Sequence, residues 1–183
     1  MAGDHRLGVS VVRKPQIAGS TRSMMIVAML VCVAMVLSII ESFIPLSFTI
    51  PGIKLGLANL VVLCGIYVLS FRQALTLAIL KCLMTAWIFG SFSAFLFSVV
   101  GTLLSFFVMW LLVRHKVGTV IVSCVGAVCH NIGQIAVAAL VVGSSKVFYY
   151  LPILIIVGAA AGLVIGLCVR AVLPYISHLK DED

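Results

Sequence analysis

A lysine, a histidine and two carboxamides lie inside apolar runs of this sequence. Lys81 is in the middle of one run, and a second run contains His130, Asn131 and Gln134. A lysine in hydrocarbon costs about 2.5–3.5 kcal/mol on insertion scales, so it needs a partner, a water-filled cavity or a ligand. The lysine and the histidine can attract an anion, and the carboxamides can donate and accept hydrogen bonds. These residue types predict a binding site for a polar or anionic group.

The composition places these residues in a membrane protein. Of the 183 residues, 63% are hydrophobic and 9% are charged, whereas soluble domains carry about 25% charged residues. Apolar runs of about 20 residues, the length that crosses a bilayer, recur along most of the chain. We therefore expect an all-α integral membrane protein with six transmembrane helices. The expected spans are about 24–41, 51–69, 73–90, 92–113, 118–142 and 149–173.

The expected organisation is a basic N-terminal segment (1–22), a six-helix domain (23–173) and a short tail (174–183). The two ends are too short to bury a core, so we expect no soluble catalytic domain. The first apolar run follows basic residues, as in a signal peptide, but no small-residue cleavage site comes after it. We expect it to be retained as the first span.

The distribution of lysine and arginine predicts the orientation. On one side lie the basic residues of the two ends together with Arg72, Arg114 and Lys116, whereas the opposite loops hold only Lys146, with Lys54 just inside a helix start. The positive-inside rule then places both termini in the cytoplasm. The net charge of +7 is thereby explained by topology and by contact with anionic lipids, and we expect no nucleic-acid binding.

On this topology the polar residues share one half of the membrane. Lys54 is one turn into the second span, and Asn59 lies about 7 Å deeper. Gln134 is one turn from His130 on the same helix face. If these residues face one another, they line a pocket open to the outside. The candidate ligand-binding residues are Glu41, Lys54, Asn59, Lys81, His130, Asn131 and Gln134.

The inventory of these side chains indicates the kind of ligand. Glu41 is the only carboxylate within the spans, and the start of the second helix, near residues 52–55, offers free N–H groups that attract anions. An anionic or strongly polar organic ligand with an apolar body fits best. The apolar lining is expected from Phe43, Phe48, Trp87, Phe89, Phe92, Phe95, Tyr149 and Tyr150, all of which could instead be interface anchors.

Each polar candidate also has a structural interpretation, and both remain open. Glu41 and Lys54 could form no more than an ion pair at the rim. Lys81 could extend to the interface, or pair with Glu41 or a carbonyl. His130 could be a packing residue, and Asn59 could join two helices by a hydrogen bond.

Small residues at four-residue spacing indicate close helix packing. Gly158, Gly162 and Gly166 line one face of the last span, with Ala34 and Ser38 as a weaker pair in the first. Such faces let helices approach closely. Packing within the chain is the favoured interpretation of the glycines, and a docking face for another membrane subunit is the alternative. The six cysteines lack metal-ligand spacing and are interpreted as apolar packing residues, so no metal is expected.

Several enzymatic functions are disfavoured. The sequence has no G-x-x-x-x-G-K-[ST] loop, so we expect no ATP hydrolysis by this chain. Apart from Glu41 the acids lie at the termini, as Asp4, Asp181, Glu182 and Asp183. Diphosphate chemistry with Mg²⁺ needs clustered carboxylates, which argues against prenyl transfer by this chain alone. We expect no cofactor and no catalytic residue.

Three segments resemble a known bacterial membrane family. They are Glu41-x3-Pro45 followed by Pro51-Gly52-Ile53-Lys54-Leu55-Gly56-Leu57-Ala58-Asn59; Phe71-Arg72-Gln73-Ala74-Leu75 leading to Leu80-Lys81-Cys82-Leu83; and Gly126-x3-His130-Asn131-x2-Gln134. The family is named Gx transporter or heptaprenyl diphosphate synthase component I. The resemblance covers about residues 24–173, and the segment 51–59 is its most specific part.

That family is similar in size, span number and topology to the S components of energy-coupling factor (ECF) transporters. The resemblance implies an ECF S-component-like bundle that captures a micronutrient at the outer face of the bacterial cytoplasmic membrane. It implies as partners a membrane coupling subunit and two ATPases. S components usually dock through an A-x-x-x-A face on the first helix, whereas this sequence has Ala28-x3-Cys32 and Ala34-x3-Ser38.

Three functions follow as hypotheses. The first is a substrate-binding subunit for uptake of a small anionic or amphiphilic nutrient or cofactor precursor. The second is an accessory subunit of polyprenyl diphosphate or menaquinone synthesis, working with a soluble prenyl synthase. The third is a solitary secondary transporter that uses Glu41, Lys81 or His130 as a proton relay. The absence of matching broken helices in two halves ranks it last.

Overall fold

The computed structural model describes residues 21–43, 56–89 and 92–181, and their regular structure is entirely helical. The elements are α1 (Thr21–Ser42), α3 (Leu57–Val68), α4 (Phe71–Phe89), α5 (Phe92–Arg114), α6 (Thr119–Val142), the 3-10 helix η1 (Ser145–Tyr150) and α7 (Leu151–Asp181). The expected all-α class is confirmed for these residues.

Five of the helices, α1, α4, α5, α6 and α7, are long and apolar enough to cross a membrane. Their outer surfaces are apolar as well: Leu140 is 81% exposed, Met24 74% and Ile156 70%. An exposed apolar surface of this extent is unfavourable in water and is expected where side chains face lipid. Because helices satisfy their own backbone hydrogen bonds, they can cross hydrocarbon. The fold is that of a multi-pass membrane protein.

The second expected span is shorter than predicted. α3 has 12 residues, about 18 Å at 1.5 Å per residue, against a hydrocarbon thickness of about 30 Å. Gly56 precedes it with φ 74°, a left-handed conformation that glycine adopts readily and that ends a continuous helix. The prediction of one helix over 51–69 is therefore wrong at Gly56. Lys54 and the Pro51-Gly52 start lie outside the described residues.

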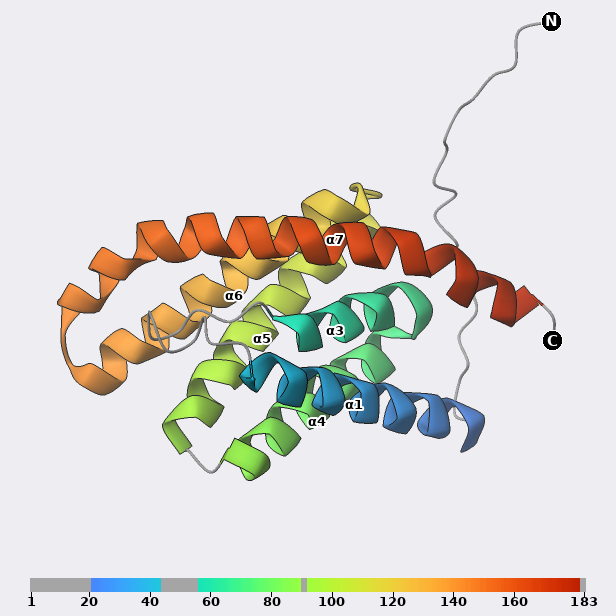
Figure 1. Ribbon diagram of the computed structural model, residues 1–183, viewed down its shortest axis with the longest axis horizontal. Helices are drawn as coiled ribbons and strands as arrows, with labels where there is room; N and C mark the ends of the chain where they lie inside the picture. Colours follow the sequence, from blue (N-terminus) through green and yellow to red (C-terminus); the bar gives the residue numbers. More distant parts are fainter. Residues whose placement is uncertain (1–20, 44–55, 90–91, 182–183) are drawn as a thin grey trace, which may run out of the picture.

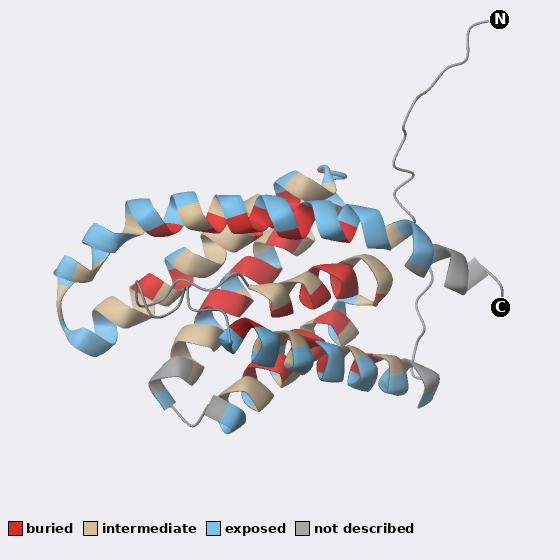
Figure 2. Ribbon diagram, viewed as in Figure 1, coloured by how far each residue is buried: buried red, intermediate tan, exposed pale blue. Residues whose placement is uncertain are grey.

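α3 occupies the centre of the bundle (Figure 1). α7 runs along one side of it and α1 with α4 along the other, while α6 packs between α5 and α7. Seven residues of α3 are buried, among them Val61, Val62 and Leu63. Figure 2 shows the buried residues concentrated on α3 and on the inner faces of its neighbours.

The two ends of the bundle differ in what they contain. The start of α1 and the end of α7 lie at one end (Figure 1), here called the terminal end, with Arg114 at the end of α5. The opposite end, here called the loop end, contains the end of α1 at Ser42, the start of α5 and η1. α7 continues through Pro174 to Asp181, so the expected tail from 174 onward is helical as far as Asp181.

Glycines set the close approach of α7 to α6. Gly158, Gly162 and Gly166 are buried, and a methyl group added to Gly162 would lie 2.7 Å from the Cα of Cys124. The face therefore packs within the chain, as the favoured interpretation had it. The docking assignment of these glycines must be corrected, because α6 covers them.

The second small-residue pair also faces inward. Ala34 is 0% exposed, and Ser38 lines an internal cavity. These two residues are therefore not available on the outer surface of α1 for a partner helix. Ala28 and Cys32 of the same helix are exposed, so the outer face of α1 carries the other small pair.

Candidate functional site

A cavity of about 630 Å³ lies within the bundle, lined by residues of α1, α3, α4, α5, α6, η1 and α7. Its size falls in the range of about 300–1,000 Å³ that is typical of ligand pockets. Six of the seven sequence-predicted binding residues line it: Glu41, Asn59, Lys81, His130, Asn131 and Gln134. The seventh, Lys54, lies outside the described residues.

Asn59 and Lys81 join α3 to α4 at this cavity. The Lys81 ammonium donates a hydrogen bond of 2.7 Å to Asn59 Oδ1, and Lys81 is only 6% exposed. Asn59 is in the first turn of α3, where its own N–H donates to the Gly56 carbonyl over 2.7 Å. The carboxamide orients the ammonium group and, being neutral, places no negative charge beside it.

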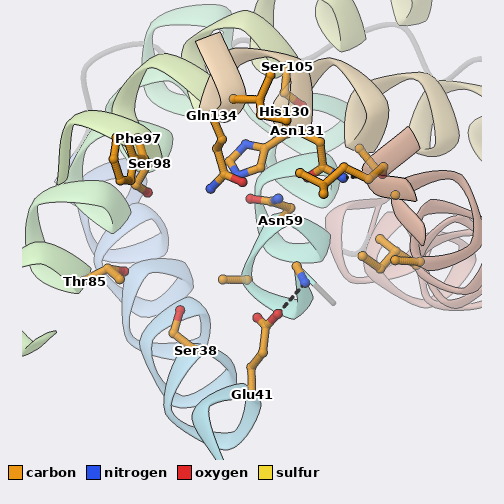
Figure 3. A pocket seen from close by; sticks show the side chains of 18 of the residues that line it. Ser38, Glu41, Asn59, Thr85, Phe97, Ser98, Ser105, His130, Asn131 and Gln134 are labelled. Atoms are coloured by element: carbon orange, nitrogen blue, oxygen red, sulfur yellow. Dashed lines mark hydrogen bonds between the residues drawn. The ribbon is translucent and has the colours of Figure 1, made fainter. Parts of the chain in front are cut away.

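Glu41 lines the cavity and also contacts the start of α3. Its carboxylate accepts hydrogen bonds from the backbone N–H groups of Gly56 (2.5 Å) and Leu57 (3.1 Å), as Figure 3 shows in part. These N–H groups begin α3, where free donors and the helix dipole favour a negative charge. The structure therefore shows Glu41 as a cap of α3, and its predicted partner Lys54 lies outside the described residues. The helix-start N–H groups that the sequence suggested for an anionic ligand, at residues 52–55, lie outside them as well.

The three polar residues of α6 are held differently. The Asn131 Nδ2 group donates to the Leu154 carbonyl of α7 over 2.8 Å, so this carboxamide joins two helices. His130 lies where α6 approaches α5: a methyl group on Gly101 would be 2.8 Å from the His130 carbonyl oxygen and 3.1 Å from its Nδ1. Within the described residues no hydrogen bond engages the Gln134 carboxamide, which lines the cavity beside His130 (Figure 3).

The apolar lining differs from the prediction. Of the six expected aromatic residues whose side chains the structure describes, only Tyr150 lines the cavity. Phe43, Trp87, Phe92 and Tyr149 are each more than 75% exposed near the loop end, where aromatic residues serve as interface anchors. Phe95 does not line it, and Phe48 and the side chain of Phe89 are outside the described part. The apolar wall comes instead from Leu63, Phe97, Met109, Ile135, Leu154 and Ile165.

Several small polar residues of the lining were missed. Ser98, Ser105 and Ser123 all face the cavity. Ser98 donates to the Cys82 sulfur over 3.5 Å, whereas Ser105 and Ser123 are buried, 3% and 4% exposed. A signal was present in the sequence, because Ser98 and Ser105, like Ser123 and His130, are seven residues apart and so share a helix face.

The described residues contain no group of three His, Cys, Asp or Glu side chains that could hold a metal ion. Among the described residues, Glu41 is the only carboxylate that lines the cavity, and both of its oxygens already accept backbone hydrogen bonds. The described lining offers hydrogen-bonding groups, a lysine and apolar side chains.

A family model described as "Heptaprenyl diphosphate synthase component I" matches residues 30–172. The chain belongs to this family. Neither the comparison with curated proteins nor that with solved structures found a match. The matched range runs from the middle of α1 into α7, so the match to the heptaprenyl diphosphate synthase component I family includes the helices that line the cavity. The resemblance stated from the sequence segments is thereby confirmed.

Proposed function

We propose that this protein is a membrane subunit that binds a small amphiphilic ligand, with an anionic or strongly polar head group, inside the bundle. The observation that carries the proposal is the convergence of Asn59, Lys81 and Gln134 from three helices on one cavity. Buried polar groups at membrane depth are unfavourable unless a partner or ligand uses them, so they mark a functional site.

The charges of the lining favour an anionic head group. The Glu41 carboxylate is offset by the start of α3, which carries about half a positive elementary charge. The Asn59 carboxamide that accepts a hydrogen bond from Lys81 is neutral, and a lysine ammonium group is a hydrogen-bond donor without acceptor capacity. An ionised carboxylate or phosphate placed beside Lys81 would gain both the Coulomb attraction and a charge-assisted hydrogen bond.

The distribution of basic residues supports an orientation with both termini in the cytoplasm. Arg72, Arg114, Lys116 and Arg170 belong to the terminal end, and Lys146 of η1 to the loop end. The cavity reaches Tyr150 near the loop end, which would then face the outside. This arrangement suits a substrate-binding subunit for uptake, working with a coupling subunit and two ATPases in the manner of ECF S components.

The test is mass spectrometry of small molecules that co-purify with the detergent-solubilised protein. Lys81→Met keeps the length of the side chain and removes its charge. Lys146→Met makes the same exchange at an exposed lysine outside the cavity. We expect one metabolite in the wild type and in Lys146→Met that is depleted at least about tenfold in Lys81→Met. Equal retention in all three proteins would contradict the proposal.

The family description favours a second function, that of an accessory component of polyprenyl diphosphate synthesis. In that case the ligand is a prenyl diphosphate or its product, and a soluble prenyl synthase supplies the carboxylates that this cavity lacks. This function predicts that a prenyl synthase co-purifies with the protein and that its product length or yield depends on the membrane subunit. Synthesis that is unchanged when the subunit is omitted would argue against it.

A further inference from the structure

Two buried hydroxyl groups line the cavity away from Lys81, and they bear on the chemistry of the ligand. Ser105 of α5 and Ser123 of α6 line the cavity and are 3% and 4% exposed. Within the described part of the chain, no hydrogen bond engages either hydroxyl. A buried hydroxyl without a partner costs about 1–3 kcal/mol, so a ligand or water that reaches these two groups is favoured.

The two serines lie on neighbouring helices, away from the polar centre of the cavity: a methyl group on Gly126, three residues from Ser123 on α6, would be 3.3 Å from the Ser105 hydroxyl oxygen. Ser105 is seven residues from Ser98 on α5, and Ser123 is seven residues from His130 on α6, which is two turns or about 10 Å in each case. Lys81 lies near Ser98 along the length of the bundle, because the Ser98 hydroxyl contacts the sulfur of Cys82, the residue next to Lys81, at 3.5 Å. Figure 3 shows Ser105 and Glu41 on opposite sides of Asn59 and His130.

The cavity wall around the serines is mostly apolar. Leu63 of α3, Met109 of α5 and Ile165 of α7 line the cavity near the serines. Met109 packs against α6 so closely that a methyl group on Gly126 would meet its sulfur. The cavity therefore has one polar region at Lys81 and a second, uncharged polar region at the serines, with apolar side chains around the second.

We propose that Ser105 and Ser123 form a second hydrogen-bonding subsite, which recognises a hydroxyl, carbonyl or ring-nitrogen group at the far end of the ligand's apolar body. This inference rests on the proposed function, since it specifies the ligand of the same cavity. It disfavours a plain isoprenoid tail, which would place hydrocarbon against both hydroxyls and leave them without partners. The ligand class is an acid or phosphate with a polar group at each end.

Matched probes test this proposal without knowledge of the natural ligand. Octanoate, decanoate and dodecanoate are each compared with the ω-hydroxy acid of the same length, as radiolabelled compounds bound to the protein in nanodiscs, with binding to empty nanodiscs subtracted. We expect the ω-hydroxy acid of at least one length to bind about two- to tenfold more tightly than its parent acid, the effect of one net hydrogen bond.

The variants assign the preference to the subsite. The double variant Ser105→Ala/Ser123→Ala should bind the ω-hydroxy acid no more tightly than its parent acid. Ser98→Ala should keep the preference, because it removes a hydroxyl from the same helix that already has a partner in Cys82. The double variant should also unfold at the wild-type temperature or above, since it removes two hydroxyls that have no internal hydrogen bond.

Three results would overturn the proposal. Suppose that the wild type binds each ω-hydroxy acid and its parent acid with equal affinity, and that Lys81→Met weakens the binding of both. This result would refute the second subsite alone and leave the proposed function in place. A lower unfolding temperature for the ligand-free double variant would show that the hydroxyls serve the fold. Binding of neither acid, in the wild type or in Lys81→Met, would refute the proposed function for anionic amphiphiles and the subsite with it.

Discussion

Replacing Glu41 by alanine should destabilise the bundle by about 3 kcal/mol. The carboxylate is 7% exposed and accepts two charge-assisted hydrogen bonds from the start of α3, each worth about 1.5–3 kcal/mol. The lower figure applies here, because Gly56 lines the cavity and water can reach its N–H when the carboxylate is gone. Two bonds at about 1.5 kcal/mol give the expected loss.

Glu41→Gln separates charge from hydrogen bonding. The carboxamide keeps one acceptor oxygen, and a neutral hydrogen bond contributes about 1 kcal/mol, so the loss should be roughly 2 kcal/mol. Gln73→Ala is the comparison, because Gln73 accepts a neutral bond from the Ser70 N–H over 3.1 Å, and the loss of that bond should cost about 1 kcal/mol. The assay is the free energy of unfolding in mixed micelles of one composition.

The order of stability is the decisive result. We expect the wild type to be followed by Gln73→Ala, Glu41→Gln and Glu41→Ala. If both Glu41 variants lie within about 0.5 kcal/mol of the wild type, the carboxylate does not hold α3 and the capping argument fails. Because Asn59 is in the first turn of α3 and accepts from Lys81, loss of the cap should also weaken ligand binding.

Three further substitutions have defined outcomes. Gly56→Ala should lower the unfolding temperature more than Gly143→Ala: both glycines have positive φ, at 74° and 64°, but only a methyl group at Gly56 meets neighbours, the nearest at 3.2 Å. Gly162→Ala should cost about 1–3 kcal/mol in chemical unfolding by forcing α7 from the backbone of α6, and a wild-type midpoint would contradict the packing. Asn131→Ala should cost about 1–2 kcal/mol, because it leaves the carbonyl of Leu154 without this donor; an unchanged free energy of unfolding would show the bond to be dispensable.

The sequence predicted the fold class and most of the helices because the physics of a bilayer acts locally. An apolar run of sufficient length satisfies its backbone only as a helix, and the loops at Gly118 and Gly143 follow from glycine at helix ends. α1, α4, α5, α6 and α7 accordingly lie close to their predicted ranges. The break at Gly56 was missed because it depends on Glu41, a residue of another helix.

In the cavity too, local sequence signals were predictable and contacts between helices were not. Residues that are costly in hydrocarbon, such as Lys81 and His130, were recognisable one by one, and the structure places them together. Their partners were not recognisable, because a hydrogen bond such as that of Asn131 to α7 depends on which helices are neighbours. The aromatic lining was mispredicted for a related reason: Trp87 and Phe92 are apolar enough for a pocket or for lipid, and only packing decides between them.

The polar groups of the bundle fall into two classes, those that are hydrogen-bonded to the backbone of another helix and those that face the cavity. The Glu41 carboxylate and the Asn131 amide are engaged with backbone groups and hold α3 and α7 in place. The hydroxyls of Ser105 and Ser123 and the carboxamide of Gln134 line the cavity, with no hydrogen bond from another described residue. A protein selected for stability alone would gain by exchanging this second group for apolar residues. Their retention in a cavity that also contains Lys81 is the physical reason to regard it as a binding site.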